Sequence, residues 1–202
     1  MEENIIGVVM AGGLSSRMGQ DKGLLKTNGR TWAENAFSKL NQLPMEIIVS
    51  INEAQKHPYA SLFHPEQLIV DKKITEGPLN GILTVHSLAP SKDLFLLACD
   101  VRDISSELVN KIYTTYLSNL SEDYDFFILK NDRQEEPLIG IYLSDFLKRI
   151  MFMAEKKVLA KNSLKYVLSF GRGFFISLDE NEKTTIKNYN TPEDLETSFT
   201  LQ

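Results

Sequence analysis

"VVMAGGLSSRMGQDKGLL", residues 8–25, joins an apolar run to a loop of glycines, serines and charged side chains. The apolar run begins at Ile5 and is rich in Ile and Val, which is typical of a strand covered on both faces in a parallel sheet. Two adjacent glycines let a backbone approach a ligand, while Arg17 and Lys22 carry charges that suit phosphate oxygens. The spacing matches neither the dinucleotide fingerprint nor the Walker loop. This stretch predicts an anion-binding loop at a sheet edge; the alternative is a plain strand-to-helix turn with solvated charges.

The rest of the chain alternates between apolar runs and helical stretches. Further strands are expected at Glu46–Ile51, Leu68–Val70, Leu94–Ala98, near Phe126–Leu129, near Pro137–Tyr142 and at Phe174–Ser177. Helices are expected from Thr31 with its capping-box partner Glu34, from Pro78 to about Ala89, from Ser105 or Ser106 to about Leu117, from Asp145 onward, and from Thr191 over "NTPEDLE". The segment "KNDRQE", residues 130–135, is expected to be a polar turn. This alternation predicts one domain over residues 1–202, with a Rossmann-like three-layer α/β/α fold, a mostly parallel sheet and ligands at its carboxyl edge.

Composition narrows the classes of function. The chain has 202 residues, of which 43% are hydrophobic and 24% are charged, and these are globular proportions. Its net charge of −5 argues against nucleic-acid binding, which usually needs a basic face. The same net charge is compatible with binding of a small phosphate ester, which needs only a few local positive groups. The single cysteine, Cys99, is expected to be a small buried strand residue, and three scattered histidines (His57, His64 and His86) lack the spacing of metal ligands. With an acidic start and only a short apolar run, the sequence favours a cytoplasmic protein without a membrane segment.

Polar residues follow three more of the expected strands. Asn52, Asp71 and Asp100 should emerge at the same sheet edge as the opening loop. An asparagine and an aspartate suit a base edge or a ribose, and a lone carboxylate facing phosphates suits magnesium. The alternatives are turn residues for Asn52 and Asp71, and a helix cap or a partner of Arg102 for Asp100. Asp103 is expected to cap the next helix rather than to bind metal.

Five segments in the same order resemble the motifs of one family. "VVMAGGLSSRMGQDKGLL" resembles the signature loop of the MobA-type nucleotidyltransferases, within the molybdopterin nucleotidyltransferase family. "EGPLNGI", "LLACDV", "EEPLIGIY" and "NYNTPEDL" resemble that family's Gly-Pro-Leu, Cys-Asp, Glu-Pro-Leu and Asn-x-Asn-Thr-Pro segments. The first motif belongs to the wider nucleotidyltransferase superfamily, and the last one narrows the match further, toward the enzymes that act on molybdopterin. The best match is to the molybdenum cofactor guanylyltransferases. The resemblance implies a nucleotidyltransferase fold.

The resemblance also implies roles for individual residues. The GTP contacts of the family fall on Met10, Ala11, Gly12, Gly13, Lys22, Asn52, Asp71 and Asp100. The resemblance also makes Asp100 the Mg²⁺ ligand and places Arg17 near the phosphates. It implies that Arg17, Lys22 and Asp100 are the catalytic residues. Asn188 and Asn190 correspond to residues on the molybdopterin side. Arg102 stands where the family often has proline, which bears on the local shape of the loop.

The reaction that the resemblance implies is the transfer of GMP from GTP to molybdopterin or its molybdenum-loaded form, with release of pyrophosphate. Insertion proteins or molybdoenzymes would be the partners that receive the product. Two alternatives stay open: a relative that uses CTP on molybdopterin or transfers a nucleotide to a sugar phosphate, and a non-catalytic nucleotide-binding module on the same fold.

Overall fold

The protein is described here from a computed structural model, which covers residues 4–12, 21–132 and 134–186. The strands are β1 (Ile5–Met10), β2 (Lys26–Thr27), β3 (Arg30–Thr31), β4 (Glu46–Ile51), β5 (Leu68–Val70), β6 (Asp93–Ala98), β7 (Phe126–Asn131), β8 (Gln134–Tyr142) and β9 (Gly173–Ser177). The α-helices are α1 (Trp32–Leu40), α2 (Lys56–Tyr59), α3 (Pro78–Leu88), α4 (Ser106–Ser118), α5 (Ser144–Glu155), α6 (Leu164–Leu168) and α7 (Glu180–Thr185). Three short 3₁₀ helices are η1 (Lys22–Leu24), η2 (Glu53–Gln55) and η3 (Pro65–Gln67) within the described ranges.

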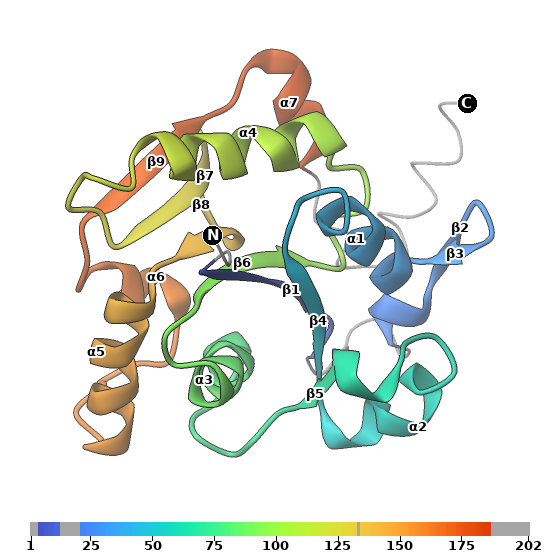
Figure 1. Ribbon diagram of the computed structural model, residues 1–202, viewed down its shortest axis with the longest axis horizontal. Coiled ribbons are helices and arrows are strands. Elements are labelled where there is room, and N and C mark those ends of the chain that lie inside the picture. Colours follow the sequence, from blue (N-terminus) through green and yellow to red (C-terminus); the bar gives the residue numbers. More distant parts are fainter. Residues whose placement is uncertain (1–3, 13–20, 133, 187–202) are drawn as a thin grey trace.

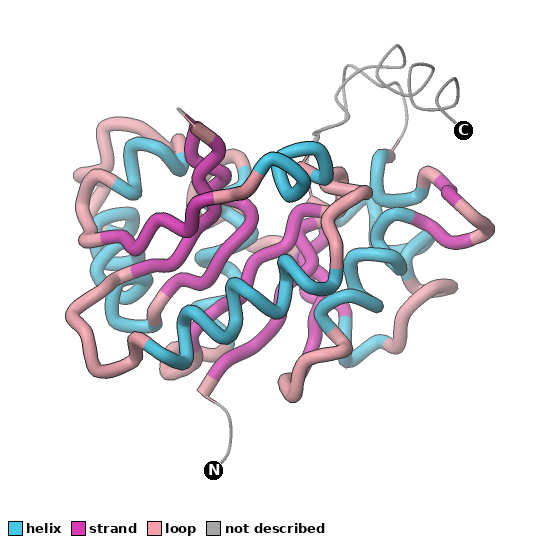
Figure 2. The backbone as a smooth tube through the Cα atoms, turned by 90° about the horizontal axis from the view of Figure 1, so that it is seen from above, coloured by secondary structure: helices cyan, strands magenta, loops and turns pink. Residues whose placement is uncertain are grey.

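The main sheet has seven strands in the order β5-β4-β1-β6-β8-β7-β9. The pairs β5/β4, β4/β1, β1/β6 and β7/β9 are parallel, while β8 runs antiparallel to both β6 and β7. The mostly parallel sheet is therefore confirmed. Its strands lie side by side across the molecule with helical segments on their flanks (Figure 2).

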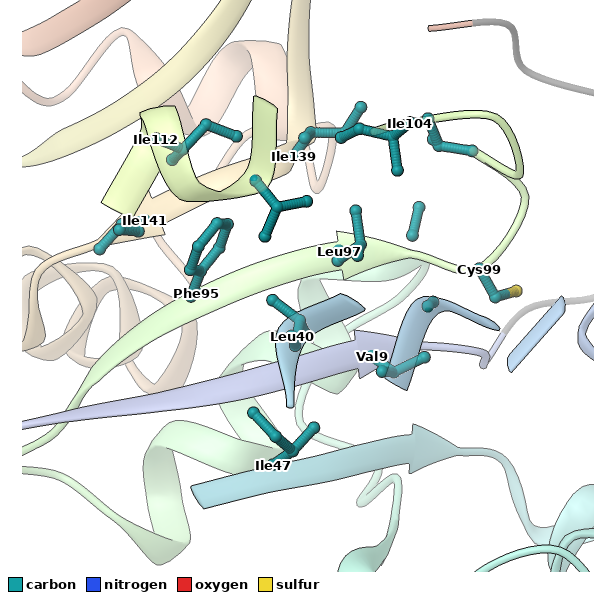
Figure 3. Packing of buried hydrophobic residues seen from close by; sticks show 14 of the residues in the cluster. Val9, Leu40, Ile47, Phe95, Leu97, Cys99, Ile104, Ile112, Ile139 and Ile141 are labelled. Carbon is teal, nitrogen blue, oxygen red and sulfur yellow. The ribbon is translucent and has the colours of Figure 1, made fainter. Parts of the chain in front are cut away.

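Helices cover both faces of the sheet, which makes the three layers visible in Figure 1. Alternate residues of β1 enter different cores because successive strand side chains point to opposite faces. Val9 packs on the side of α1 and α4, where Leu40 and Ile112 are fully buried (Figure 3), and Val8 packs on the side of α3 and α5. The apolar run that begins the sequence is thus a central strand buried on both faces.

Local signals set several of the helix boundaries. The predicted capping box is present at α1, where the Thr31 hydroxyl accepts from the Glu34 N–H and the Glu34 carboxylate accepts from the Thr31 N–H. Ser105 caps α4 by accepting a hydrogen bond from the Leu108 N–H at 3.1 Å. The prediction that Asp103 caps this helix is wrong, because its carboxylate instead binds the guanidinium of Arg102.

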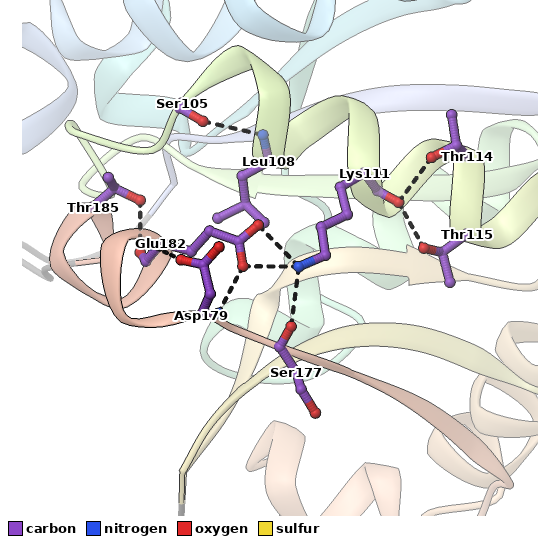
Figure 4. A network of polar contacts seen from close by, with 9 residues as sticks. All are labelled: Ser105, Leu108, Lys111, Thr114, Thr115, Ser177, Asp179, Glu182 and Thr185. Atoms are coloured by element: carbon purple, nitrogen blue, oxygen red, sulfur yellow. Dashed lines mark hydrogen bonds and ion pairs between the residues drawn. The ribbon is translucent and has the colours of Figure 1, made fainter.

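A polar network ties the far end of the sheet to α4 (Figure 4). Lys111 donates to both carboxylate oxygens of Glu182 on α7, at 2.9 and 2.8 Å, and to the carbonyl of Ser177 at the end of β9. The capping box between Asp179 and Glu182 holds α7 in this position. These contacts fix the C-terminal part of the described chain against the helical layer.

The segment "KNDRQE" differs from its prediction as a turn. Lys130 and Asn131 belong to β7, β8 begins at Gln134, and Asn131 pairs with Gln134 across the hairpin. Cross-strand pairing outweighs the polar composition here, since a tight hairpin needs only a two-residue connection. The expected helix from Thr191 lies outside the described residues. Among the residues that the structure does describe, no helix is both long enough and apolar enough to cross a membrane.

Candidate functional site

The carboxyl ends of four adjacent parallel strands carry the residues singled out by the sequence. Gly12 follows β1, Asn52 follows β4, Asp71 follows β5, and Asp100 follows β6. The backbone N–H groups of Ala11 and Gly12 both donate to the Ser50 carbonyl of β4, at 3.0 and 2.9 Å. The start of the signature loop is therefore fixed against the neighbouring strand.

Two pockets open at this edge and meet at Pro78. The first, which we name the β1–β5 pocket, has a volume of about 480 Å³ and is lined by Met10, Gly12, Asn52, Asp71, Thr75, Gly77, Pro78, Asn80 and Gly81. The second, the β6–β8 pocket, has a volume of about 500 Å³ and is lined by Pro78, Ala98, Asp100, Val101, residues 134–139 and residues 163–165. Each is large enough for a ligand the size of a nucleoside or a pterin.

Asp71 is the acidic group of the β1–β5 pocket. Its Oδ1 accepts a hydrogen bond from the Ser50 hydroxyl at 2.8 Å. Burial raises the pKa of the Asp71 carboxyl, and hydrogen bonds from Ser50 and Asn80 act in the opposite direction. A half-buried carboxylate that lines a pocket is well placed to accept from the hydroxyl or amino groups of a ligand.

The wall beside Asp71 leaves no space for an extra side chain. A Cβ on Gly81 would lie 2.7 Å from the Ser50 Oγ and 3.0 Å from the Met10 Cε. Glycine at the first turn of α3 thus brings the backbone against Met10, and it explains why the "EGPLNGI" segment needs its second glycine.

Asn52 is a local cap as well as a pocket residue. Its side-chain oxygen accepts from the Gln55 N–H at 3.2 Å, and the Gln55 Oε1 accepts from the Asn52 N–H at 2.8 Å. Asn52 is therefore a turn residue, as the alternative predicts. It also lines the β1–β5 pocket.

Lys22 and Asp100 meet although 78 positions separate them. The Lys22 Nζ lies 3.0 Å from the Asp100 Oδ2, and the two side chains are 16% and 24% exposed. This contact brings the end of the signature loop to the end of β6. The alternative in which Asp100 pairs with Arg102 is wrong, because Arg102 binds Asp103.

The loop after Asp100 is held by contacts that do not need proline. Arg102 forms a two-pronged ion pair with Asp103, with N–O distances of 2.8 and 3.1 Å. Lys39 of α1 donates to the Arg102 carbonyl at 2.7 Å, and burial lowers the pKa of this lysine. A restrained loop shape is thus achieved by an ion pair and a backbone contact at the position where the resembling family often has proline.

The cysteine and the three histidines do not line either of the two pockets. Cys99 is buried, and burial raises the pKa of its thiol, which disfavours the reactive thiolate. His57 and His64 are exposed and His86 is buried on α3. Within the described ranges, no group of three or more His, Cys, Asp or Glu side chains is arranged to hold a metal ion.

Four predicted site residues lie outside the described residues: Gly13, Arg17, Asn188 and Asn190. Sequence reasoning had also passed over several residues of the site. Ser163 and Lys165 line the β6–β8 pocket without any recognisable motif. Gln55 did carry a signal, since "NEAQ" has the spacing of a capping box.

Comparisons with known proteins identify the family of this chain. Residues 7–169 match the model of the family described as the MobA-like NTP transferase domain. The chain is 32% identical to a probable molybdenum cofactor guanylyltransferase of Carboxydothermus hydrogenoformans, over 96% of this chain and 94% of the relative. It is 26% identical to a protein of the same name from Bacillus cytotoxicus, over 95% and 94% of the two chains.

Solved structures show the same fold. Molybdopterin-guanine dinucleotide biosynthesis protein A from Archaeoglobus fulgidus superimposes with a TM-score of 0.73 at 20% identity, over 96% of both chains. A CMP:2-keto-3-deoxy-manno-octonic acid synthetase in complex with CTP superimposes with a TM-score of 0.67 at 13% identity, over 100% of this chain and 98% of the other. The fold is therefore shared by enzymes that differ in base and acceptor. On the family match and the near full-length relatives, the chain belongs to the MobA-like NTP transferase family of nucleotidyltransferases.

Proposed function

We propose that this protein transfers GMP from GTP to molybdopterin or its molybdenum-loaded form and releases pyrophosphate. The observation that carries the proposal is the contact of Lys22 with Asp100 at the edge where two ligand-sized pockets meet. The names of the full-length relatives supply the substrates. The product would pass to molybdoenzymes or to the proteins that load them, in the cytoplasm.

Each pocket takes one substrate in this proposal. The β1–β5 pocket receives the guanosine, with Met10, Gly12, Asn52 and Asp71 lining it. Ala11 is assigned to the same substrate on the resemblance of the signature loop. The β6–β8 pocket receives the acceptor, since Asp100 lines it and would face the acceptor phosphate. Asn188 and Asn190 belong to the acceptor side on the resemblance of their motif. The shared residue, Pro78, marks the boundary at which the reacting groups would meet.

The reaction joins one phosphate to another. An oxygen of the acceptor phosphate forms a bond with the α-phosphorus of GTP, and the bond from that phosphorus to the bridging oxygen breaks, so pyrophosphate leaves. A phosphate monoester has a second pKa of about 6, so near neutral pH it is already largely dianionic and needs no strong general base. The site accordingly needs to control charge more than it needs to move protons.

The residues present fit a magnesium ion. Magnesium sites often use one or two carboxylates and complete their coordination with waters and substrate phosphates, and Asp100 offers one carboxylate at the place where the phosphates would lie. When bound, Mg²⁺ would neutralise phosphate charge and orient the reacting oxygens. Lys22 holds the Asp100 carboxylate and would supply a positive charge to the phosphates, together with Arg17 and the N–H group of Gly13.

One experiment separates this function from its alternatives. The purified protein is incubated with molybdopterin, Mg²⁺ and each of the four nucleoside triphosphates in turn, and pyrophosphate release is followed. We expect release with GTP, and tighter binding of GTP than of CTP or ATP in calorimetry. Equal or faster turnover with CTP would assign the protein to the cytidylyl branch, and binding without any turnover would indicate a non-catalytic module.

A further inference from the structure

The buried side chain of Gln55 joins three segments that the proposed site depends on. Its Nε2 donates to the Ala11 carbonyl at 2.9 Å and to the Asp21 Oδ2 at 2.7 Å, and its Oε1 accepts from the Asn52 N–H at 2.8 Å. Ala11 precedes and Asp21 follows residues 13–20, while Asn52 ends β4. Only 6% of Gln55 is exposed, so water does not readily replace these bonds.

Asp21 is held from two more directions. The N–H of Gly23 donates to its Oδ1 at 2.9 Å, and the hydroxyl of Tyr59 donates to the same oxygen at 3.2 Å. A Cβ on Gly23 would overlap the Tyr59 hydroxyl, so the chain can pass this close only as glycine. Asp21 immediately precedes Lys22, and these contacts therefore fix the backbone from which the Lys22 side chain reaches Asp100.

We infer that Gln55 is a positioning residue: its amide sets the backbone at Asp21 so that Lys22 faces Asp100, and it fixes Asn52 at the same time. This inference rests on the proposed function of Lys22 and Asp100. The position needs one acceptor and two donors in a fixed arrangement, and a primary amide supplies this set. A shift of the lysine by about 1 Å would be enough to lower turnover by as much as about 10²-fold.

The decisive variant is Gln55→Glu. This variant keeps the size of the side chain and an acceptor for the Asn52 N–H. At a pH above the pKa of the introduced glutamate, however, a second carboxylate lies against the Asp21 carboxylate and the Ala11 carbonyl. Burial and the nearby Asp21 would raise the pKa of the introduced carboxyl, and the protonated form would regain one donor. The titratable groups that interact with Asp21 are Tyr59 and Cys99, and Cys99 in turn interacts with Lys22 and Asp100.

We expect Gln55→Glu to lower kcat for pyrophosphate release by about 10-fold to 10²-fold at pH 8, in the range that a misplaced catalytic group costs. Relative to the unmodified protein at each pH, the activity of this variant should recover as the pH falls toward 6. Gln55→Leu, which has no donor in either state, should lose activity to a similar extent and show no such recovery.

Gln67→Glu is the matched control. Gln67 makes the equivalent side-chain contact on η3, with its Oε1 accepting from the His64 N–H at 3.0 Å, but it lines neither pocket. We expect normal turnover and a pH profile that follows the unmodified protein. A Gln55→Glu profile that also follows the unmodified protein would overturn the inference and leave the proposed function intact.

A second measurement separates failure of the inference from failure of the proposed function. If the unmodified protein releases no pyrophosphate with any nucleotide, the proposed function fails, and a double-mutant cycle on the urea midpoint then tests the inference. Gln55→Glu and Lys22→Ala should be non-additive if Gln55 sets the position of Lys22. Additive shifts would show that the two side chains act independently and would overturn the inference.

Discussion

Replacing Lys22 with alanine should separate the stability of the protein from its activity. The variant removes the ion pair with Asp100, whose N–O distance is 3.0 Å and whose side chains are 16% and 24% exposed. Exposed ion pairs contribute about 0.2–1 kcal/mol to stability, and this pair lies near the upper end because it is partly shielded from water. Asp100 would keep access to solvent in the variant, so its charge would be hydrated rather than left in the core.

The two expected losses differ in size. A destabilisation of about 1 kcal/mol corresponds to a fall in Tm of roughly 2–4 °C for a chain of this length. Removing one electrostatic stabiliser of a developing charge costs about 10²–10³-fold in turnover, or about 2.7–4 kcal/mol in the activation free energy. Lys22→Ala should therefore be folded and nearly inactive under conditions in which the unmodified protein turns over.

The assay is pyrophosphate release at saturating GTP and magnesium, paired with thermal unfolding of the same samples. Lys148→Ala is the control, because Lys148 is also in an ion pair, with Asp145, but is half exposed and lies on α5 away from both pockets. Lys22→Arg tests geometry, since arginine keeps the charge and changes its shape. Full activity of Lys22→Ala, or a loss of activity no larger than its loss of folded protein, would refute the reasoning.

Two further predictions concern Asp100, the proposed metal ligand, and His86, a buried base. Asp100→Asn keeps the size of the side chain and removes its charge. We therefore expect a higher magnesium requirement and almost no pyrophosphate release at low magnesium, while GTP still binds in calorimetry. Normal turnover at low magnesium would contradict the role of Asp100. Burial, and to a lesser extent the nearby charge of Lys148, lower the pKa of His86 below 6.5. Below pH 6.5 His86 therefore binds a proton more readily in the unfolded chain than in the folded chain. The free energy of unfolding should accordingly fall as the pH drops below 6.5. In urea titrations from pH 7.5 to 5.5, His86→Leu should show a shallower fall than the unmodified protein, and equal slopes would count against this assignment.

Much of the fold and part of the site were accessible from local patterns in the sequence. An unbroken apolar run predicts a doubly covered strand because both of its faces must leave water, and the β1 residues Val8 and Val9 do enter opposite cores. The capping box at Thr31 and the proline that begins α3 are also local, since each depends on a few neighbouring backbone groups. Strand ends in a parallel sheet share one edge, so the gathering of Asn52, Asp71 and Asp100 followed from order along the chain.

Other features depended on contacts between distant parts of the chain. Asp103 and Ser105 are both good caps, and the pairing of Asp103 with Arg102 leaves Ser105 to cap α4. Residues 130–135 look like a turn by composition, yet pairing between β7 and β8 makes most of them strand. The type of a polar residue shows which hydrogen bonds and ion pairs it can form. Tertiary packing decides which partner lies close enough to form them.

The sequence by itself determined the seven strands of the main sheet and the helices α1, α3, α4 and α5 in their order along the chain, the sheet edge that would carry the site, and the charged residue types that suit phosphates. Lys22 and Asp100 were also expected at this one edge, and the structure confirms that they meet there. Only the tertiary structure decided that the two form a direct ion pair, that Gln55 bridges Ala11, Asp21 and Asn52, and that two pockets meet at Pro78. The physical reason is range: the geometry of a strand or helix sets the spacing of its buried residues, and capping acts between neighbours in the chain, so both leave a fixed spacing in the sequence. Hydrogen bonds and ion pairs between segments act over about 3 Å in space and carry no fixed spacing along the chain.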